Sequence, residues 1–164
     1  MSLNQLLIAE FEQESKSTKK ILERVPFDNP GWKPHEKSMP LGRLATHIAD
    51  LPKIIFAAVN LDEMDFVKSD YVPRVASSSS ELISIFEENY VKGMNALKNA
   101  DDDNLMKNFT LRRGERIIFT QTKIRAIRSY LNHIYHHRAQ LGVYLRLLNV
   151  PLPSTYGPTA DEPM

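Results

Sequence analysis

Residues 124–148 read IRAIRSYLNHIYHHRAQLGVYLRLL, and this stretch predicts the longest helix of the chain. Its apolar residues recur at the spacing of one helix face. The helix should cover residues 121–149, because the proline at position 151 prevents it from continuing. The residues expected on the buried face are Ile124, Ile127, Leu131, Ile134, Leu141, Leu145 and Leu148.

Three other segments show the same periodicity and predict three more long helices. In the second of these, Pro52 lies inside the apolar pattern, so a bend is expected there. The third begins at Ser78, which with Glu81 fits a capping box, a common signature of a helix start. The predicted helices cover residues 3–24, 40–60 and 79–100.

The connections between these helices are long. Residues 25–39 contain three prolines and a glycine and predict a loop, with Phe27 and Trp32 packing it onto the body. The acidic run 101–103 should end the third helix, and the β-prone residues 108–121 predict a short hairpin or an irregular excursion. Beyond Pro151 the chain is rich in proline, and an extended tail is expected.

Four amphipathic helices with such connections predict an all-α fold, a four-helix bundle with crossover connections. A chain of 164 residues fits a single domain, here residues 1–164. Hydrophobic residues make up 42% of it and charged residues 25%, which is ordinary for a globular protein.

Charge and cysteine content narrow the class of protein further. The 21 basic and 20 acidic side chains leave a formal net charge of +1, which argues against nucleic acid or membrane partners. The chain has no cysteine, so disulfides, thiolate catalysis and cysteine zinc sites are excluded. Since no basic leader or long apolar run is present, a cytoplasmic protein is expected.

Three of the five histidines form a pattern typical of a metal site. His133 and His137 lie four residues apart on one predicted helix, so both imidazoles point from the same face. His47 lies on the flank of another predicted helix, next to its apolar face. Two ligands from one helix and one from a second would leave a fourth position for water or substrate, as in catalytic zinc sites.

Plainer interpretations remain open at this point. A histidine at the edge of a core is usually just hydrogen-bonded, and helical histidine pairs also occur by chance on surfaces. A helical bundle without metal would place His47 far from the pair. We expect His35 to lie in an exposed loop and His136 to be solvated.

Several other polar residues have expected roles. Arg138 falls beside the core face and is expected to form a buried ion pair with a glutamate of the first helix. Tyr130 and Tyr144 are expected to pack in the core, with hydroxyls near the edge of the cavity. Gln140 and Asp50 are candidates to orient a metal-binding histidine. Asp161 and Glu162, in the tail, are candidates to cover the site.

The chain resembles the DinB-like (DinB/YfiT) superfamily of metal-binding bundles. The resemblance rests on four segments in the family's order: WKPHEKSM at 32–39, LATHIA at 44–49, HIYHHRAQL at 133–141, and the tail with VPLP at 150–153 and YGPTADE at 156–162. It implies an up-down-down-up four-helix bundle, often dimeric. It also implies metal ligands at His47, His133 and His137, with zinc or nickel bound.

Some members of that superfamily are thiol-dependent transferases or isomerases. We therefore predict a divalent-metal-dependent enzyme, with zinc preferred over nickel. It would act on a small molecule as an S-transferase using a low-molecular-weight thiol, or as a hydrolase. No carboxylate base is evident beside the ligands, which favours the thiol route. The alternative is a non-catalytic metal- or small-molecule-binding bundle with a stress-related role or a role in dimer interactions.

Overall fold

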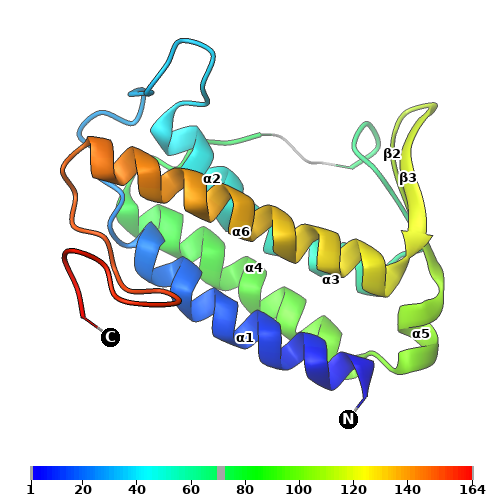
Figure 1. Ribbon diagram of the computed structural model, residues 1–164. Helices are drawn as coiled ribbons and strands as arrows, with labels where there is room; N and C mark the ends of the chain where they lie inside the picture. The colour runs from blue at the N-terminus through cyan, green and yellow to red at the C-terminus, as the bar shows by residue number, and fades with distance from the viewer. Residues whose placement is uncertain (1, 70–72, 164) are drawn as a thin grey trace.

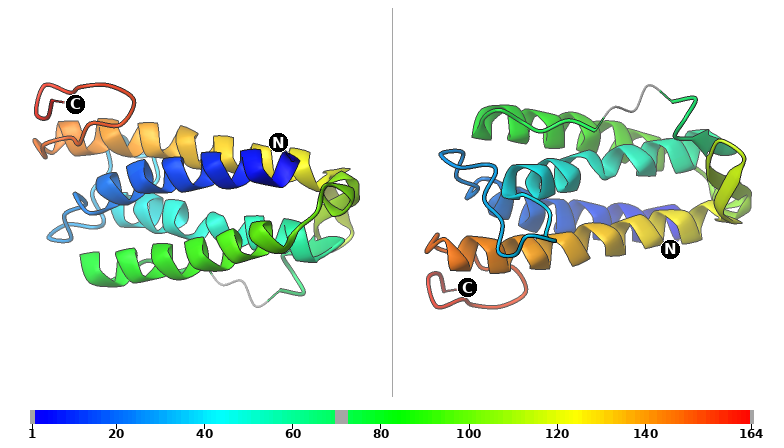
Figure 2. Two further views of the ribbon diagram at one scale, coloured as in Figure 1. Left: turned by 90° about the horizontal axis from the view of Figure 1, so that it is seen from below. Right: turned by 90° about the horizontal axis from the view of Figure 1, so that it is seen from above.

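Four long helical segments lie side by side in the computed structural model, which describes residues 2–69 and 73–163 (Figure 1). Helices α1 and α2–α3 each contact both α4 and α6, and the two views of Figure 2 show these four segments packed around a common centre. The predicted helical character is confirmed. The segments are α1 (Leu3–Leu22), α2 (Leu41–Asp50) with α3 (Pro52–Asn60), α4 (Ser79–Asn99) and α6 (Lys123–Leu147).

The predicted bend at Pro52 is a break between two helices. Helix α2 ends at Asp50 and α3 begins at Pro52, whose missing N–H interrupts the helical hydrogen bonds. Asn89 of α4 stabilises the break, since its side-chain amide donates to the Ala49 carbonyl at 3.1 Å. This arrangement fixes the last turn of α2, which carries His47.

The start of α4 contains half of the predicted capping box. The Ser78 hydroxyl accepts a hydrogen bond from the Glu81 backbone N–H at 3.2 Å, as expected. The Glu81 carboxylate does not return to Ser78. It accepts from the Ser77 backbone N–H at 2.7 Å and from the Ser77 hydroxyl at 2.6 Å.

The all-α prediction is incomplete, because a three-stranded sheet lies at one end of the helices (Figure 1). Strand β2 pairs antiparallel with β3 and parallel with β1. Gly114 opens the two-residue β2–β3 turn at φ 59°, a conformation that favours glycine. The predicted hairpin is confirmed, whereas a three-residue strand such as β1 is too short to show alternation. The strands are β1 (Glu63–Asp65), β2 (Asn108–Arg113) and β3 (Arg116–Thr122).

A short helix, α5 (Asp102–Met106), was also not predicted. The acidic run does follow the end of α4, but it begins a new helical turn as well. The Asp101 carboxylate accepts a hydrogen bond from the Asn104 backbone N–H at 2.7 Å and so caps α5.

Two hydrophobic clusters hold the molecule together, one near the sheet and one at the opposite end. Helix α6 contributes to both, through Ile127 and Leu131 in the first and Leu141 and Leu145 in the second. Trp32 and Phe27 pack the 25–39 loop against the second cluster, as predicted. None of the helices within the described residues is both long enough and apolar enough to span a membrane.

Candidate metal centre

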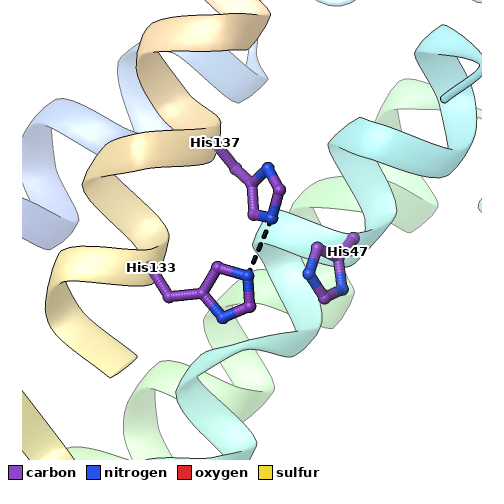
Figure 3. A group of neighbouring side chains, drawn as sticks. All are labelled: His47, His133 and His137. Atoms are coloured by element: carbon purple, nitrogen blue, oxygen red, sulfur yellow. Dashed lines mark hydrogen bonds between the residues drawn. The ribbon is translucent and has the colours of Figure 1, made fainter. Parts of the chain in front are cut away.

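The three predicted ligands lie together between α2 and α6 (Figure 3). His47 projects from α2, and its ring centroid is 5.2 Å from that of His133 and 4.8 Å from that of His137. The latter two centroids are 4.6 Å apart. One ligand nitrogen from each ring lies within 4.8 Å of the other two. A bundle with His47 far from the pair is therefore contradicted, while metal binding itself stays a prediction.

The spacing of the rings fits one metal ion after a small adjustment. The Nε2 atoms of His133 and His137 are 2.8 Å apart and share a hydrogen bond. Two imidazole ligands of a tetrahedral zinc ion, each about 2.0 Å from it, would have their nitrogens roughly 3.3 Å apart. Separating the two rings by about half an ångström, which small side-chain rotations achieve, would accommodate the ion. An all-imidazole ligand set suits zinc, nickel or copper.

Burial keeps the three imidazoles neutral, which is the form that binds metal. It lowers the pKa of His47 to about 4, with further lowering from the nearby charges of His137, His133 and Arg43. Burial also lowers the pKa values of His133 and His137. A neutral ring has a lone pair on one nitrogen, and at pH 7 few protons would compete with a metal ion for that lone pair.

Gln140 fixes the tautomer of one predicted ligand. Its side-chain oxygen lies 2.7 Å from Nδ1 of His137, so this nitrogen donates the hydrogen bond. The lone pair of His137 then resides on Nε2, the atom that faces His133. Outer hydrogen bonds of this kind orient metal-binding histidines. The geometry agrees with the outer role predicted for Gln140.

Asp50 does not have the predicted outer role. Its carboxylate pairs with Arg74 at 3.5 Å and lies 3.5 Å from the Asn89 amide, and no hydrogen bond joins it to a histidine of the described chain. Its second oxygen is buried without a hydrogen-bond partner. Burial raises the pKa of this carboxyl group, against the opposing effect of Arg74. Asp50 lines the same cavity as His47, but Arg74 and the α4 residue Asn89 bind its carboxylate in place of a histidine.

The expected covering of the site by the tail is also wrong. Asp161 accepts hydrogen bonds from the Arg146 guanidinium and the Leu152 backbone N–H. Glu162 accepts from the Ser154 backbone N–H and lies near Arg24. Figure 2 shows the tail beside the C-terminal part of α6. Its Tyr156 hydroxyl donates to Glu14 of α1 at 2.7 Å, and no described residue of the tail lines the cavity beside the histidines.

The prediction for Arg138 is confirmed. Its guanidinium, with the side chain 5% exposed, lies 2.7 Å from the Glu14 carboxylate of α1. The expectations for the remaining histidines also hold: His136 is exposed, and His35 lies exposed in the 25–39 loop. Neither belongs to the group that the described residues offer for a metal ion.

A cavity of about 380 Å³ adjoins the histidine cluster and is lined in part by His47 and His133. Its volume is in the range of small-molecule sites. Tyr130 lines it as predicted, and burial raises the pKa of its hydroxyl to about 12. Tyr144 does not reach it, because its hydroxyl donates to the Met39 carbonyl at 3.1 Å.

Three cations that the sequence pattern did not single out also line this cavity: Arg43, Lys53 and Arg113. Arg43 carried a usable signal, since it precedes His47 by four residues and therefore lies on the same face of α2. Arg113 carried none. It reaches the cavity from the end of β2, and the pairing of distant strands brings it there.

Comparisons with known proteins agree on one family. The model of the DinB family matches residues 1–163. A solved DinB-like protein from Bacillus cereus superposes with a TM-score of 0.71 at 19% identity, covering 92% of this chain and 95% of that one. A second, from Bacillus subtilis, gives 0.67 at 17% identity, with 97% and 99% covered. No curated protein matches. At these identities the two structures support the fold alone.

Proposed function

Because the chain belongs to the DinB family, we propose that it is a divalent-metal-dependent enzyme acting on a small molecule. His47, His133 and His137 would hold the ion, with zinc preferred and nickel as the alternative. One observation carries this proposal: three half-buried imidazoles converge beside a cavity of about 380 Å³. Three protein ligands next to an open space are typical of catalytic rather than structural zinc sites.

The bound ion would supply Lewis acidity, which lowers the pKa of a thiol or a water molecule and polarises an electrophile. The chain's own residues do the remaining work. His47, His133 and His137 are neutral because they are partly buried, and their ligand nitrogens converge. Gln140 orients the His137 ring. The walls of the cavity exclude water from one side of the reacting atoms.

Of the two reactions, transfer to a low-molecular-weight thiol is the better supported. In many metal-dependent hydrolases a carboxylate next to the ligands assists the bound water as a general base. Asp50 is the one carboxylate among the described lining residues; Arg74 and Asn89 hold one of its oxygens, and it does not belong to the group of ligand atoms formed by the three histidines. A thiol depends less on such a base, because its pKa is already far below that of water before a metal ion lowers it further. Its sulfur then bonds to the electrophilic carbon while the leaving group departs with the electron pair.

The alternative is a non-catalytic metal- or small-molecule-binding bundle. The histidine group favours it too, since no carboxylate of the described residues joins the three ligand nitrogens.

We also propose the up-down-down-up order of helices, supported by the opposite directions of α2–α3 and α6 in Figure 1. A homodimer, with no nucleic acid or membrane partner, completes the proposal.

A direct assay separates these functions. Protein purified without a polyhistidine tag would be stripped with a chelator and reloaded with zinc or nickel. Thiol transfer to chlorodinitrobenzene and hydrolysis of nitrophenyl acetate would then be compared in the wild type, His137→Ala and the control His136→Ala. We expect metal-dependent thiol transfer, lost in His137→Ala and retained in the control. Metal binding without either activity over a broad panel of thiols and electrophiles would support the non-catalytic alternative.

A further inference from the structure

The cavity beside the histidines has a charge pattern that metal binding alone does not explain. Among the described residues that line it, Arg43, Lys53 and Arg113 are cationic and only Asp50 is anionic. The charge of Asp50 is balanced from outside the lining, by Arg74 at 3.5 Å. The lining therefore has an excess of positive charge, and a ligand of opposite charge would complement it.

Arg43 has the clearest unused hydrogen-bonding capacity of these cations. Its Nη1 is buried and has no hydrogen-bond partner within the described chain. A buried donor without an acceptor is costly, and such groups in native proteins are usually satisfied by water or a ligand. A guanidinium binds carboxylates well, because its planar fork can donate two parallel hydrogen bonds.

The position of Arg43 determines where an anion would lie relative to the metal centre. Arg43 precedes His47 by one turn on the same face of α2, so their Cβ atoms lie roughly 5–6 Å apart. An anionic group held by Arg43 would therefore lie in the same cavity as His47 and His133. The rest of the ligand would extend from there toward these two histidines.

The remaining walls are suited to an apolar body of limited size. The lining includes Ile54, Ile118 and Tyr130, and Phe66 lies under the Arg113 guanidinium at 6.0 Å from the ring centroid. A cavity of about 380 Å³ would hold roughly a dozen water molecules, which limits the ligand to a small molecule. Arg43 is the one lining cation with a buried nitrogen that lacks a partner within the described chain, so a ligand with a single anionic group is favoured.

We propose that this cavity binds a small amphipathic monocarboxylate. Its carboxylate would lie on Arg43, its apolar body against Ile54 and Ile118, and its reacting atom beside the histidine cluster. This inference rests on the proposed function, because it names the substrate class of that same centre. It assigns to Arg43 the role of binding the anionic end of the substrate.

Three probes of similar shape and different charge test this proposal. Binding of phenylpropionate, phenylpropanol and phenylpropylamine would be measured by calorimetry on the full chain, both metal-free and zinc-loaded. The methyl signals of Ile54 and Ile118 would be followed by NMR. We expect phenylpropionate to bind at least about tenfold more tightly than the alcohol, the amine to bind weakest, and both methyl groups to shift. Equal affinities, or shifts confined to other residues, would overturn the proposal.

Variants of Arg43 sharpen the test. Arg43→Met should weaken phenylpropionate binding about ten- to hundredfold, because a charged hydrogen bond is lost, and Arg43→Lys should restore part of the affinity. Arg125→Met removes an exposed arginine of α6 that does not line the cavity, and should change nothing. Unchanged affinity in a folded Arg43→Met protein would contradict the assignment; if that variant fails to fold, the selectivity of the wild type decides.

Zinc content, measured in every sample, separates this inference from the proposed function. Selective carboxylate binding by a chain that takes up no zinc would contradict the metalloenzyme and leave the anion site standing. Zinc uptake without a preference for phenylpropionate would contradict the anion site and leave the metal centre standing.

Discussion

His137 and Arg138 are neighbours on α6 but belong to two polar clusters of opposite character. Arg138 faces α1 within a closed network: its guanidinium donates to the Glu14 carboxylate at 2.7 Å, the Glu14 carbonyl at 3.1 Å and the Thr18 hydroxyl at 3.2 Å. It also donates to the Tyr156 hydroxyl at 2.5 Å, which in turn donates to Glu14 at 2.7 Å.

His137 faces α2 within an open cluster. Its hydrogen bonds go to His133 and Gln140, and His47 makes no hydrogen bond to another described residue. A cluster whose polar atoms satisfy one another stabilises the folded chain, whereas neutral imidazoles with unused lone pairs are ready to bind. Substitutions in the Arg138 network should therefore change stability, and those around His137 should change metal affinity.

The largest effect on stability is expected for Arg138→Met. The substitution leaves the Glu14 carboxylate, whose side chain is only 12% exposed, without its cation, and breaking a largely buried pair costs about 3–5 kcal/mol. Urea denaturation would measure the free energy of unfolding, and metal affinity should be unchanged at temperatures where the variant is folded.

The double variant Glu14→Leu with Arg138→Met is the matched control. Removing both charges should recover most of the lost stability, since no unpaired charge remains buried. A single variant that costs less than about 1 kcal/mol would show that the pair is solvated, and the contrast between the clusters would then fail.

Gln140→Leu should act on the open cluster alone. Without the amide oxygen, His137 loses the group that orients its ring, and metal affinity should fall about 10–100-fold. A competition titration with a chromogenic chelator would measure this, with Asn132→Leu as a control at an exposed amide of the same helix. Equal affinities in the two variants would remove Gln140 from the metal centre.

A smaller effect is expected from pH. The folded-state pKa of His47 is about 4, against 6.5 for an unperturbed histidine. Between these values the unfolded chain binds more protons, so the metal-free protein should lose stability as pH falls from about 6.5 toward 4, with little change from this group above that window. His47→Leu should reduce the slope between pH 6.5 and 5, above the range where unfolded carboxylates titrate. Identical slopes in both proteins would argue against a buried, neutral His47.

The smallest effect is expected for Tyr156→Phe. The hydroxyl links the tail to Arg138 and Glu14, but the side chain is 70% exposed, so its removal should cost about 1 kcal/mol. Tyr130→Phe is the comparison, because that hydroxyl makes no hydrogen bond to another described residue. Thermal unfolding of both variants should show a shift only for Tyr156→Phe, and equal shifts would mean that the tail is not held by this contact.

The two clusters also differ in how far the sequence predicts them. Helical periodicity alone placed Arg138 beside the core and the His133–His137 pair on one flank, because both depend on the spacing within α6. The cavity depends on contacts between segments far apart in the chain. Phe66 follows β1 and Arg113 ends β2, so their meeting requires a strand pairing that no local pattern specifies. The tail was misplaced for the same reason, since ion pairs such as Asp161–Arg146 determine its path.

Metal content is the most direct test of the three-histidine centre. The protein would be produced without a polyhistidine tag or nickel resin, and its metals quantified by mass spectrometry before and after dialysis against zinc. His137→Ala would be compared with His136→Ala, which removes an adjacent exposed histidine. We predict about one metal ion per chain in the wild type and the control, and none in His137→Ala. A wild-type protein that neither carries nor takes up zinc or nickel would contradict the account.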